Sequence, residues 1–318
     1  MGTTEHKWRQ WRRKRDKRVV LTGIAGNLGQ EVARRLHRDW SVIGIDRRKV
    51  RGLPPDVEFH ALDIRRRKTE DIFRRGHIDA LIHLNIMHNP RQSSREHHEF
   101  NIVGTQKIFE LAQQHGVGKI ILLSSANVYG PAATNNQFLT EEAPLLAGEN
   151  FEGIRDLVAV DMYASSFFWR HPEIETVILR PVHIVGQVRN APSNYLRKET
   201  VMTLFGYDPM VQLIHVNDVI EAILCGLRPG VRGIYNIAGP GELPLSELLR
   251  QLDRARFPVP EPIARPILSA LFQARLSSFP VDELDHIKYV CMVDDSRARE
   301  QMRYAPTMTL EETLATLR

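Results

Sequence analysis

The feature that most constrains the fold is a regular alternation of short apolar runs and amphipathic segments through the first 180 residues. Apolar runs bounded by turn residues predict strands, and segments with a period near 3.6 predict helices. Strands that read as continuous apolar runs are typical of parallel sheets covered on both faces. The sequence therefore predicts an α/β fold with a doubly wound parallel sheet. The expected strands are 18–23, 42–46, 57–62, 80–84, 119–124 and 176–179, and the expected helices are 27–38, 67–75, 96–115 and 155–170.

Beyond Arg180 the alternation gives way to irregular segments that contain proline. One strand–helix return at 211–227 and one strand at 233–237 are expected to extend the sheet. The sequence thus predicts three parts along the chain. They are a flexible leader of residues 1–17, a sheet domain of 18–180 plus 211–239, and a smaller discontinuous cap of 181–210 plus 240–318.

Charge is concentrated in the leader. The first 18 residues hold eight basic and two acidic side chains, whereas the formal net charge of the whole chain is +5. The folded part is therefore nearly neutral, and specific nucleic-acid binding is not expected. A solvated tail is the simplest interpretation of the leader, with weak contact to a polyanion or membrane surface as the alternative.

Composition excludes several classes of protein. The 42% hydrophobic and 25% charged fractions are those of a globular chain. No apolar run is long enough to cross a membrane, and the leader lacks the apolar region of a secretory signal. The two cysteines cannot form a disulfide framework, and no Cys/His cluster predicts a metal site. We expect a cytoplasmic protein.

A glycine-rich turn follows the first expected strand, with Gly23, Gly26 and Gly29 spaced three apart at the start of a helix. One glycine makes the turn, the next lets a pyrophosphate approach the backbone, and the third lets the helix pack on the strand. The helix amides then face the anion. This pattern predicts a dinucleotide site that includes Ala25, Asn27 and Leu28.

Asp46 ends the second expected strand, 23 residues after Gly23. A carboxylate there accepts hydrogen bonds from the adenosine ribose and repels a 2′-phosphate, which favours NAD. Arg47 and Arg48 follow directly and could pair with that phosphate, so NADP is the alternative. Asp63 and Ile64, after the third strand, are expected near the adenine, with a helix-capping role for Asp63 as the other interpretation.

With these motifs the sequence resembles an extended short-chain dehydrogenase/reductase of the NAD-dependent epimerase/dehydratase family, from about residue 18 to about 316. The resemblance also rests on the segments 82–85, 101–105, 123–130, 179–181 and 214–219. It implies a Rossmann-like dinucleotide-binding domain, a substrate-binding cap, and an epimerase, dehydratase or oxidoreductase activity on substrates such as nucleotide sugars. It further implies cofactor contacts from Leu84, Asn85, Ile86, Asn101, Ser124, Arg155, Pro181 and His183.

The same resemblance implies that Ser125 hydrogen-bonds the reacting oxygen, and that a Tyr-x-x-x-Lys pair follows on the next long helix. Tyrosine transfers the proton, and lysine lowers the pKa of the tyrosine and holds the nicotinamide ribose. Counted back from Arg180, these two positions fall on Gly153 and Leu157. A shift of two residues offers Phe151 and Arg155, which restores a cation but no phenol. The usual pair is therefore expected to be absent.

Two interpretations of this departure stay open. In the first, His88 or His183 carries the proton, because histidine titrates near neutrality and both follow strands that end near the expected nicotinamide. In the second, the chain binds the dinucleotide without turnover and acts as a sensor or assembly partner. In either case the helix over 155–170 carries apolar side chains suited to a homodimer contact.

Overall fold

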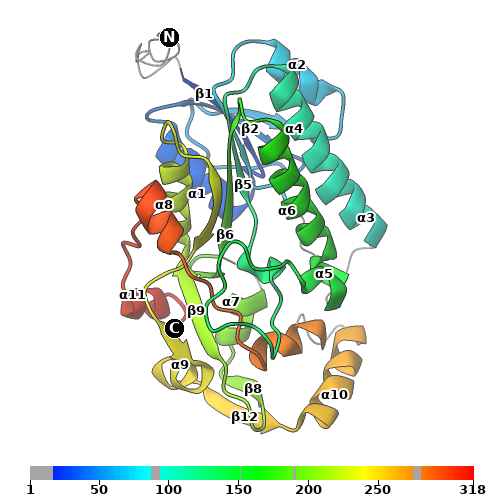
Figure 1. Ribbon diagram of the computed structural model, residues 1–318, viewed down its shortest axis with the longest axis vertical. Coiled ribbons are helices and arrows are strands. Elements are labelled where there is room, and N and C mark those ends of the chain that lie inside the picture. Colours follow the sequence, from blue (N-terminus) through cyan, green and yellow to red (C-terminus); the bar gives the residue numbers. More distant parts are fainter. Residues whose placement is uncertain (1–16, 87–93, 151, 189–190, 275–280) are drawn as a thin grey trace.

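The computed structural model describes residues 17–86, 94–150, 152–188, 191–274 and 281–318, so the basic leader lies outside the described residues. The main sheet has seven parallel strands in the order β10-β6-β5-β4-β1-β2-β3 (Figure 1). The prediction of a doubly wound parallel sheet is confirmed. The strands are β1 Arg18–Thr22, β2 Ser41–Asp46, β3 Glu58–Ala61, β4 Ala80–His83, β5 Lys119–Leu123, β6 Glu175–Pro181 and β10 Gly233–Ile237.

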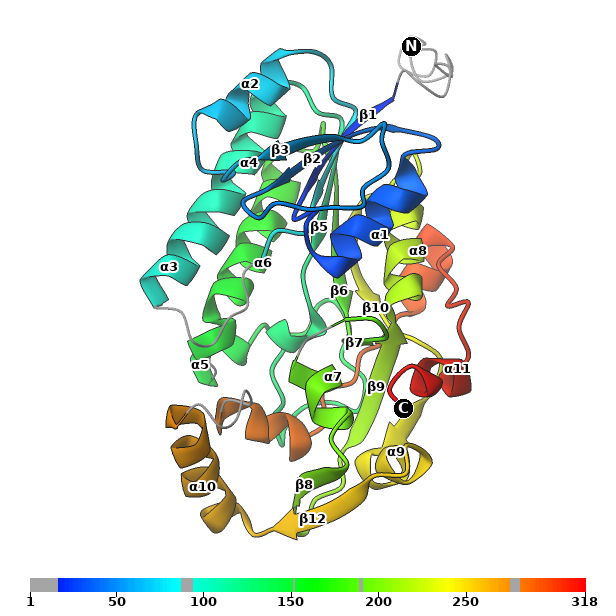
Figure 2. The same cartoon turned by 180° about the vertical axis from the view of Figure 1, so that it is seen from behind.

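Helices cover both faces of this sheet (Figures 1 and 2). Successive side chains of a strand point to opposite faces, so Val19 and Leu21 pack in one core cluster and Val20 in the other. The first cluster is closed by α1 (Asn27–Leu36) and α8 (Val216–Gly226). The second is closed by α2 (Lys68–Arg74), α4 (Gly104–Gln114) and α6 (Glu152–Arg170).

The helix expected over 96–115 runs as three consecutive segments. They are α3 (Ser94–His98), a π-helical turn η1 (Glu99–Val103) and α4. A π-helical turn inserts an extra residue into the hydrogen-bond ladder and is frequent at functional sites. Asn101, one of the expected cofactor contacts, lies in this turn and is buried.

The cap consists of two small sheets and short helices around a third core cluster. Its strands pair in the orders β11-β9-β7 and β12-β8. The strands are β7 His183–Val185, β8 Thr200–Leu204, β9 Met210–His215, β11 Glu242–Pro244 and β12 Ala255–Val259. The helices are α7 Ala191–Leu196, α9 Leu245–Gln251, α10 Glu261–Gln273, η3 Val281–Ile287 and α11 Leu310–Ala315, while the short α5 Ala147–Asn150 and η2 Ala126–Val128 lie between β5 and α6.

One sequence expectation about the sheet is wrong. The strand of the 211–227 return was expected to extend the main sheet, but β9 pairs with β7 and β11 instead. The strand at 233–237 does extend it, because β10 pairs in parallel with β6. An isolated apolar run carries no information on which neighbour it pairs with, since pairing is a nonlocal choice.

The end of the chain returns from the cap to the sheet. Ala298 and Met302 of η4 (Ala298–Met302) pack in the core cluster beneath α8. The Tyr304 hydroxyl donates to the Ala238 carbonyl at 2.9 Å, and the Thr307 amide donates to Asp218 Oδ1 at 2.7 Å. These contacts hold residues 298–307 against α8 and the end of β10. None of the helices in the described ranges combines the length and apolar character needed to cross a bilayer.

A buried histidine joins the sheet to α4 directly below the glycine turn. His83 Nδ1 lies 2.6 Å from Thr22 Oγ1, and His83 Nε2 lies 2.9 Å from Thr105 Oγ1. Burial lowers the pKa of His83 to about 3. The imidazole is therefore neutral in the folded protein at any pH at which the protein would be handled.

This histidine predicts a pH-dependent stability. Below about pH 6.5, His83 binds a proton in the unfolded chain but stays neutral in the folded chain. The free energy of unfolding therefore falls as the pH drops from about 6.5 towards 3. The slope expected from one such group is about 1.4 kcal/mol per pH unit. Urea unfolding between pH 4 and 6 should show a slope that is smaller by this amount in His83→Asn. An unchanged slope in the variant would contradict the assignment.

Candidate cofactor site

The glycine turn connects β1 to α1 at the carboxyl edge of the sheet. Gly23 has a φ of +77°, and a Cβ there would lie 3.0 Å from the Leu84 backbone. A Cβ on Gly29 would collide with the Gly23 carbonyl oxygen and lie 2.8 Å from Ile24 Cα. Only glycine satisfies both positions, because one needs a left-handed backbone and the other a close approach between helix and turn.

Gly26 differs from the other two glycines of the turn, Gly23 and Gly29. Its φ of −72° suits any residue, and a Cβ there would meet only the Gly23 carbonyl oxygen at 3.3 Å and Arg48 Nη2 at 3.8 Å. Gly26 precedes α1, and no side chain caps the first turn of that helix. The backbone therefore forms a cradle that a side chain at this position would partly fill. A diphosphate fits this cradle, since uncapped helix amides and a bare backbone favour an anion.

The remaining residues of the turn are held by specific contacts. The Ala25 amide donates to Asp46 Oδ2 at 3.1 Å, and the Asn27 side chain donates to the Gln187 carbonyl at 2.9 Å. Leu28 packs against the first core cluster. The turn is thus tied to the end of β2 and to the segment that follows β7.

The adenosine end of the expected site is rich in paired charges. Asp46 is buried, and Asp63 forms a two-point pair with Arg65, with Nε to Oδ1 at 2.9 Å and Nη2 to Oδ2 at 2.6 Å. Burial acts to raise the pKa of Asp63, but the hydrogen bonds from Arg65 lower it on balance. The Arg47 guanidinium stacks on the Phe100 ring at 4.5 Å.

Ile64 is fully buried, and its Cδ1 lies against the backbone of α4 at Gly104. It therefore supports the helix that carries Asn101.

Leu84, Asn85 and Ile86 follow β4 beside the glycine turn. The Leu84 amide donates to the Thr22 carbonyl at 3.2 Å, and the Ile86 amide donates to the Leu84 carbonyl at 3.0 Å. All three are partly buried. They lie at the carboxyl edge of the sheet, next to the glycine turn. His88, the first histidine expected to carry a proton, lies outside the described residues.

Ser124 and Ser125 follow β5 and have different partners. The Ser124 hydroxyl donates to Asp161 Oδ2 at 2.6 Å and is buried. The Ser125 Oγ accepts the Asn127 amide at 3.2 Å and thereby caps η2, which leaves its hydroxyl proton for another acceptor. Cys291 Sγ lies 3.9 Å from the Ala126 carbonyl, and burial raises the pKa of this thiol to about 12. Cys291 is therefore a thiol at neutral pH.

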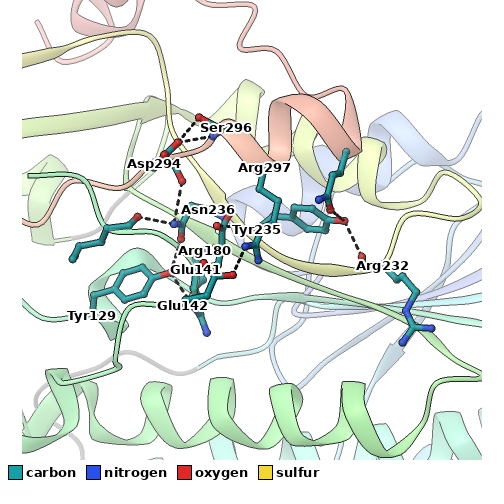
Figure 3. Close-up of polar contacts among 12 residues, drawn as sticks. Tyr129, Glu141, Glu142, Arg180, Arg232, Tyr235, Asn236, Asp294, Ser296 and Arg297 are labelled. Atoms are coloured by element: carbon teal, nitrogen blue, oxygen red, sulfur yellow. Dashed lines mark hydrogen bonds and ion pairs between the residues drawn. The ribbon is translucent and has the colours of Figure 1, made fainter. Parts of the chain in front are cut away.

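A buried polar network lies behind these serines. Arg180 donates to Asp161 through Nε at 3.0 Å and Nη2 at 2.6 Å, and to the Tyr129 hydroxyl through Nη1 at 2.8 Å. The Tyr129 hydroxyl in turn donates to Asn236 Oδ1 at 2.7 Å. Figure 3 shows Tyr129, Arg180 and Asn236 meeting beside Glu141. The network joins η2, α6, β6 and β10.

The network also fixes protonation states. Burial raises the pKa of Tyr129 to about 12. Burial alone would lower the pKa of Arg180, but its bonds to Asp161 raise it on balance. Sequence reasoning missed Asp161 in this role, although Arg180 stood in one of the motifs. The sequence does contain one signal for this role, because Asp161 lies on the apolar face of a predicted helix. A buried carboxylate at such a position requires a partner of opposite charge.

The helix that should carry the Tyr-x-x-x-Lys pair is α6. Gly153 and Leu157 both lie on it, and Leu157 packs against the first core cluster. Arg155 is exposed, and Phe151 lies outside the described residues.

Pro181 ends β6, and His183 begins β7, where it pairs with Leu213. The His183 ring lies 5.7 Å from the His286 ring, and burial lowers the pKa of His183 to about 4. The imidazole of His183 is neutral at pH 7, and the lowered pKa makes it a weaker base than an exposed histidine.

Comparisons with known proteins agree with this architecture. A family model described as the NAD dependent epimerase/dehydratase family matches residues 19–238. An uncharacterized protein of Mycobacterium tuberculosis is 26% identical over 260 residues, which cover 80% of this chain and 69% of that protein. A UDP-glucose 4-epimerase of Dictyostelium discoideum is 27% identical over 251 residues, covering 67% and 72%.

Among solved structures, the UDP-glucose 4-epimerase of Thermotoga maritima with UDP-glucose superposes with a TM-score of 0.73 at 19% identity. The match covers 94% of this chain and 97% of that one. At this identity the likeness supports the fold. The family model matches more than half of the chain, so the expectation of NAD as the family's cofactor and the family resemblance are both confirmed. This chain belongs to the NAD dependent epimerase/dehydratase family.

Proposed function

We propose that the chain binds NAD and acts as an epimerase or oxidoreductase on a hydroxyl-bearing substrate such as a nucleotide sugar, with an atypical active site. The observation that carries this proposal is the bare-backbone cradle at Gly26, set between Gly23 and Gly29 at the start of α1. Bound nicotinamide would supply hydride transfer. The Dictyostelium and Thermotoga relatives are named for UDP-glucose, which supports the substrate class.

The chain's own residues have separate tasks in this proposal. The turn and the first amides of α1 bind the diphosphate, and Leu84, Asn85 and Ile86 guide the dinucleotide across the sheet edge. Ser125 orients the reacting oxygen through its free hydroxyl proton. His183, neutral at pH 7, accepts the proton of the substrate hydroxyl, and His88 is the alternative carrier.

The residues of α6 at the expected tyrosine and lysine positions favour a second function. Leu157 occupies the expected lysine position and packs into the core, so no cation reaches the nicotinamide ribose from there. Gly153 offers no phenol. A chain that retains the dinucleotide cradle without this pair would bind NAD and report its presence through partner contacts. In this alternative the protein is a sensor or assembly partner without turnover.

A homodimer through α6 remains our proposal for the assembly. Met162 is 58% exposed and Trp169 is 76% exposed, and they lie seven residues apart on one face of α6. Large apolar side chains on a helix face are suited to burial against a second copy. Light scattering on the full chain should give twice the monomer mass, and a monomer at micromolar concentration would refute the dimer.

Coenzyme binding and turnover test the two functions separately. Calorimetry of the full chain with NAD and NADH should give heat at one site per chain. Turnover should then be detected with at least one nucleotide sugar in a substrate panel, either as a lasting change in nicotinamide absorbance for net oxidation or reduction, or as formation of the epimeric sugar for epimerisation, which returns the nicotinamide to its starting state. Ser125→Ala should lower turnover about 10²-fold or more at unchanged NAD affinity, because it removes an interaction with the reacting oxygen. Heat without turnover supports the silent protein, and no heat with either coenzyme refutes both functions.

A further inference from the structure

A cavity opens beside α1, on the face of the main sheet that α1 and α8 cover. Its volume is about 870 Å³, which is within the range of sites that bind small molecules. Its walls come from α1, the segment after β7, α7, the start of α8 and residues on either side of α11. Figure 2 shows α7 and α11 below α1 and α8 in this part of the molecule.

The cavity follows α1 away from the glycine turn. The helix contributes Asn27, Gln30, Glu31 and Arg34, whose spacings of three and four residues place them on one side of α1. Arg34 lies about 10 Å along the helix from Asn27, since each helical residue adds about 1.5 Å. Of the residues expected to contact the coenzyme, only Asn27 lines this cavity. The cavity is therefore separate from the diphosphate cradle.

Arg197 gives the cavity a positive charge. This residue lines the cavity directly after α7 and is partly buried. Its Nη1 donates to the Val188 carbonyl at 2.9 Å, and its Nη2 donates to the Gly186 carbonyl at 2.5 Å. In the part of the chain that the structure describes, no carboxylate oxygen lies within 4 Å of this guanidinium. Main-chain carbonyls thus orient Arg197 without neutralising it, and its remaining N–H groups are available to an anion.

The other charged side chains of the wall cancel each other. Arg34 forms an ion pair with Glu31 on α1. His215 Nδ1 accepts the Asn217 amide at 3.2 Å and so caps α8, and burial lowers the pKa of His215. Its imidazole is therefore neutral at pH 7. The charge of Arg197 is the net charge that remains, and a guanidinium binds phosphate oxygens through charge-assisted hydrogen bonds.

Carboxamides supply most of the other polar groups of the wall. Among the described residues, the side-chain amides of Gln187, Asn194 and Asn217 have no protein partner, so they are available to a ligand. A carboxamide both donates and accepts hydrogen bonds, as a sugar hydroxyl does. Only three of the lining side chains are apolar, and an apolar ligand would leave the polar wall unsatisfied. The lining carboxamides are Asn27, Gln30, Gln187, Asn194 and Asn217.

We propose that this cavity is a second ligand site, which binds a small hydroxyl-bearing anion of the sugar-phosphate class. The phosphate lies against Arg197, and the hydroxyls bind the carboxamides. The inference goes beyond the proposed function, because the site shares only Asn27 with the expected dinucleotide contacts.

Calorimetry of the full chain with glucose 6-phosphate and ribose 5-phosphate, with and without NAD present, tests the proposal. We expect one site per chain for at least one of the two probes. Glucose lacks the anion and inorganic phosphate lacks the hydroxyls, so each should bind at least about 10-fold more weakly. Arg197→Gln should weaken binding of the sugar phosphate about 10-fold or more, because it removes the charge that holds the phosphate.

A second variant keeps the test open if Arg197→Gln fails to fold. Asn194→Asp places a carboxylate three residues from Arg197 without removing a protein contact, and should weaken sugar-phosphate binding by a similar factor. Two matched controls should leave the affinity unchanged. Lys198→Gln removes an exposed cation from the position after Arg197, and Gln114→Glu makes the same charge change as Asn194→Asp on α4, on the opposite face of the sheet.

Three outcomes would overturn the inference. They are the absence of heat with both probes, binding of inorganic phosphate as tight as that of the sugar phosphates, and unchanged affinity in both Arg197→Gln and Asn194→Asp. The last outcome would mean that the probes bind elsewhere on the chain. None of these outcomes depends on coenzyme binding. A failure of NAD to bind would therefore overturn the proposed function and leave this second site to be judged by the sugar phosphates alone.

Discussion

Asp161→Asn is expected to lower the free energy of unfolding by about 3–5 kcal/mol, because it leaves a buried guanidinium without its counter-charge. Asp161 is fully buried and Arg180 is almost so. The carboxylate of Asp161 accepts two hydrogen bonds from Arg180 and one from Ser124. The amide of Asn can replace only one of these acceptor oxygens. Urea unfolding at pH 7 measures the loss.

Because Ser124 is bonded to Asp161 and precedes Ser125, the variant should also loosen the loop that carries the expected catalytic serine. A matched control is Glu70→Gln, which breaks the surface pair with Arg74 on α2. An exposed pair of this kind contributes at most about 1 kcal/mol, since solvent screens the two charges. Equal losses in the two variants would mean that the buried pair contributes no more than a surface pair.

Gly26→Val is expected to weaken dinucleotide binding about 100-fold or more, which corresponds to about 3 kcal/mol, at little cost to folding. The φ of −72° at Gly26 accepts a side chain, and a Cβ there would lie 3.3 Å from the Gly23 carbonyl oxygen, a tight contact that a backbone shift of a few tenths of an ångström relieves. The added isopropyl group would occupy the cradle in which the diphosphate meets the backbone. Calorimetry measures the binding loss, and thermal unfolding measures stability.

The comparison with Gly29→Ala shows which glycine serves the ligand. A Cβ on Gly29 would collide with the Gly23 carbonyl and force α1 away from the turn. Gly29→Ala should therefore lower the stability of the protein more than Gly26→Val does. If Gly26→Val binds the dinucleotide like the unsubstituted chain, the diphosphate does not lie in this turn.

The strands of the main sheet could be predicted from local sequence patterns. Strands and helices follow from local patterns of apolar residues, and all seven strands of the main sheet were expected, with ends within two residues of the predicted ones. The glycine turn was also readable, because its requirements are local: a left-handed φ at Gly23, a close helix approach at Gly29, and bare backbone at Gly26. The candidate site residues that follow β4 and β5 were named from the family resemblance.

The pairing of side chains from distant segments depends on long-range packing and could not be predicted from the sequence. Asp161 and Arg180 were both visible in the sequence, but their meeting with Ser124 depends on the packing of α6 against β5 and β6. Likewise β9 pairs with β7 and β11 and not with the main sheet, because the choice of partner strand depends on contacts between segments that are distant in the sequence. Arg48 covers Asp46 through the geometry of the turn after β2. Local patterns decide which segments become strands or helices, whereas the partner of a buried charge is decided by long-range packing.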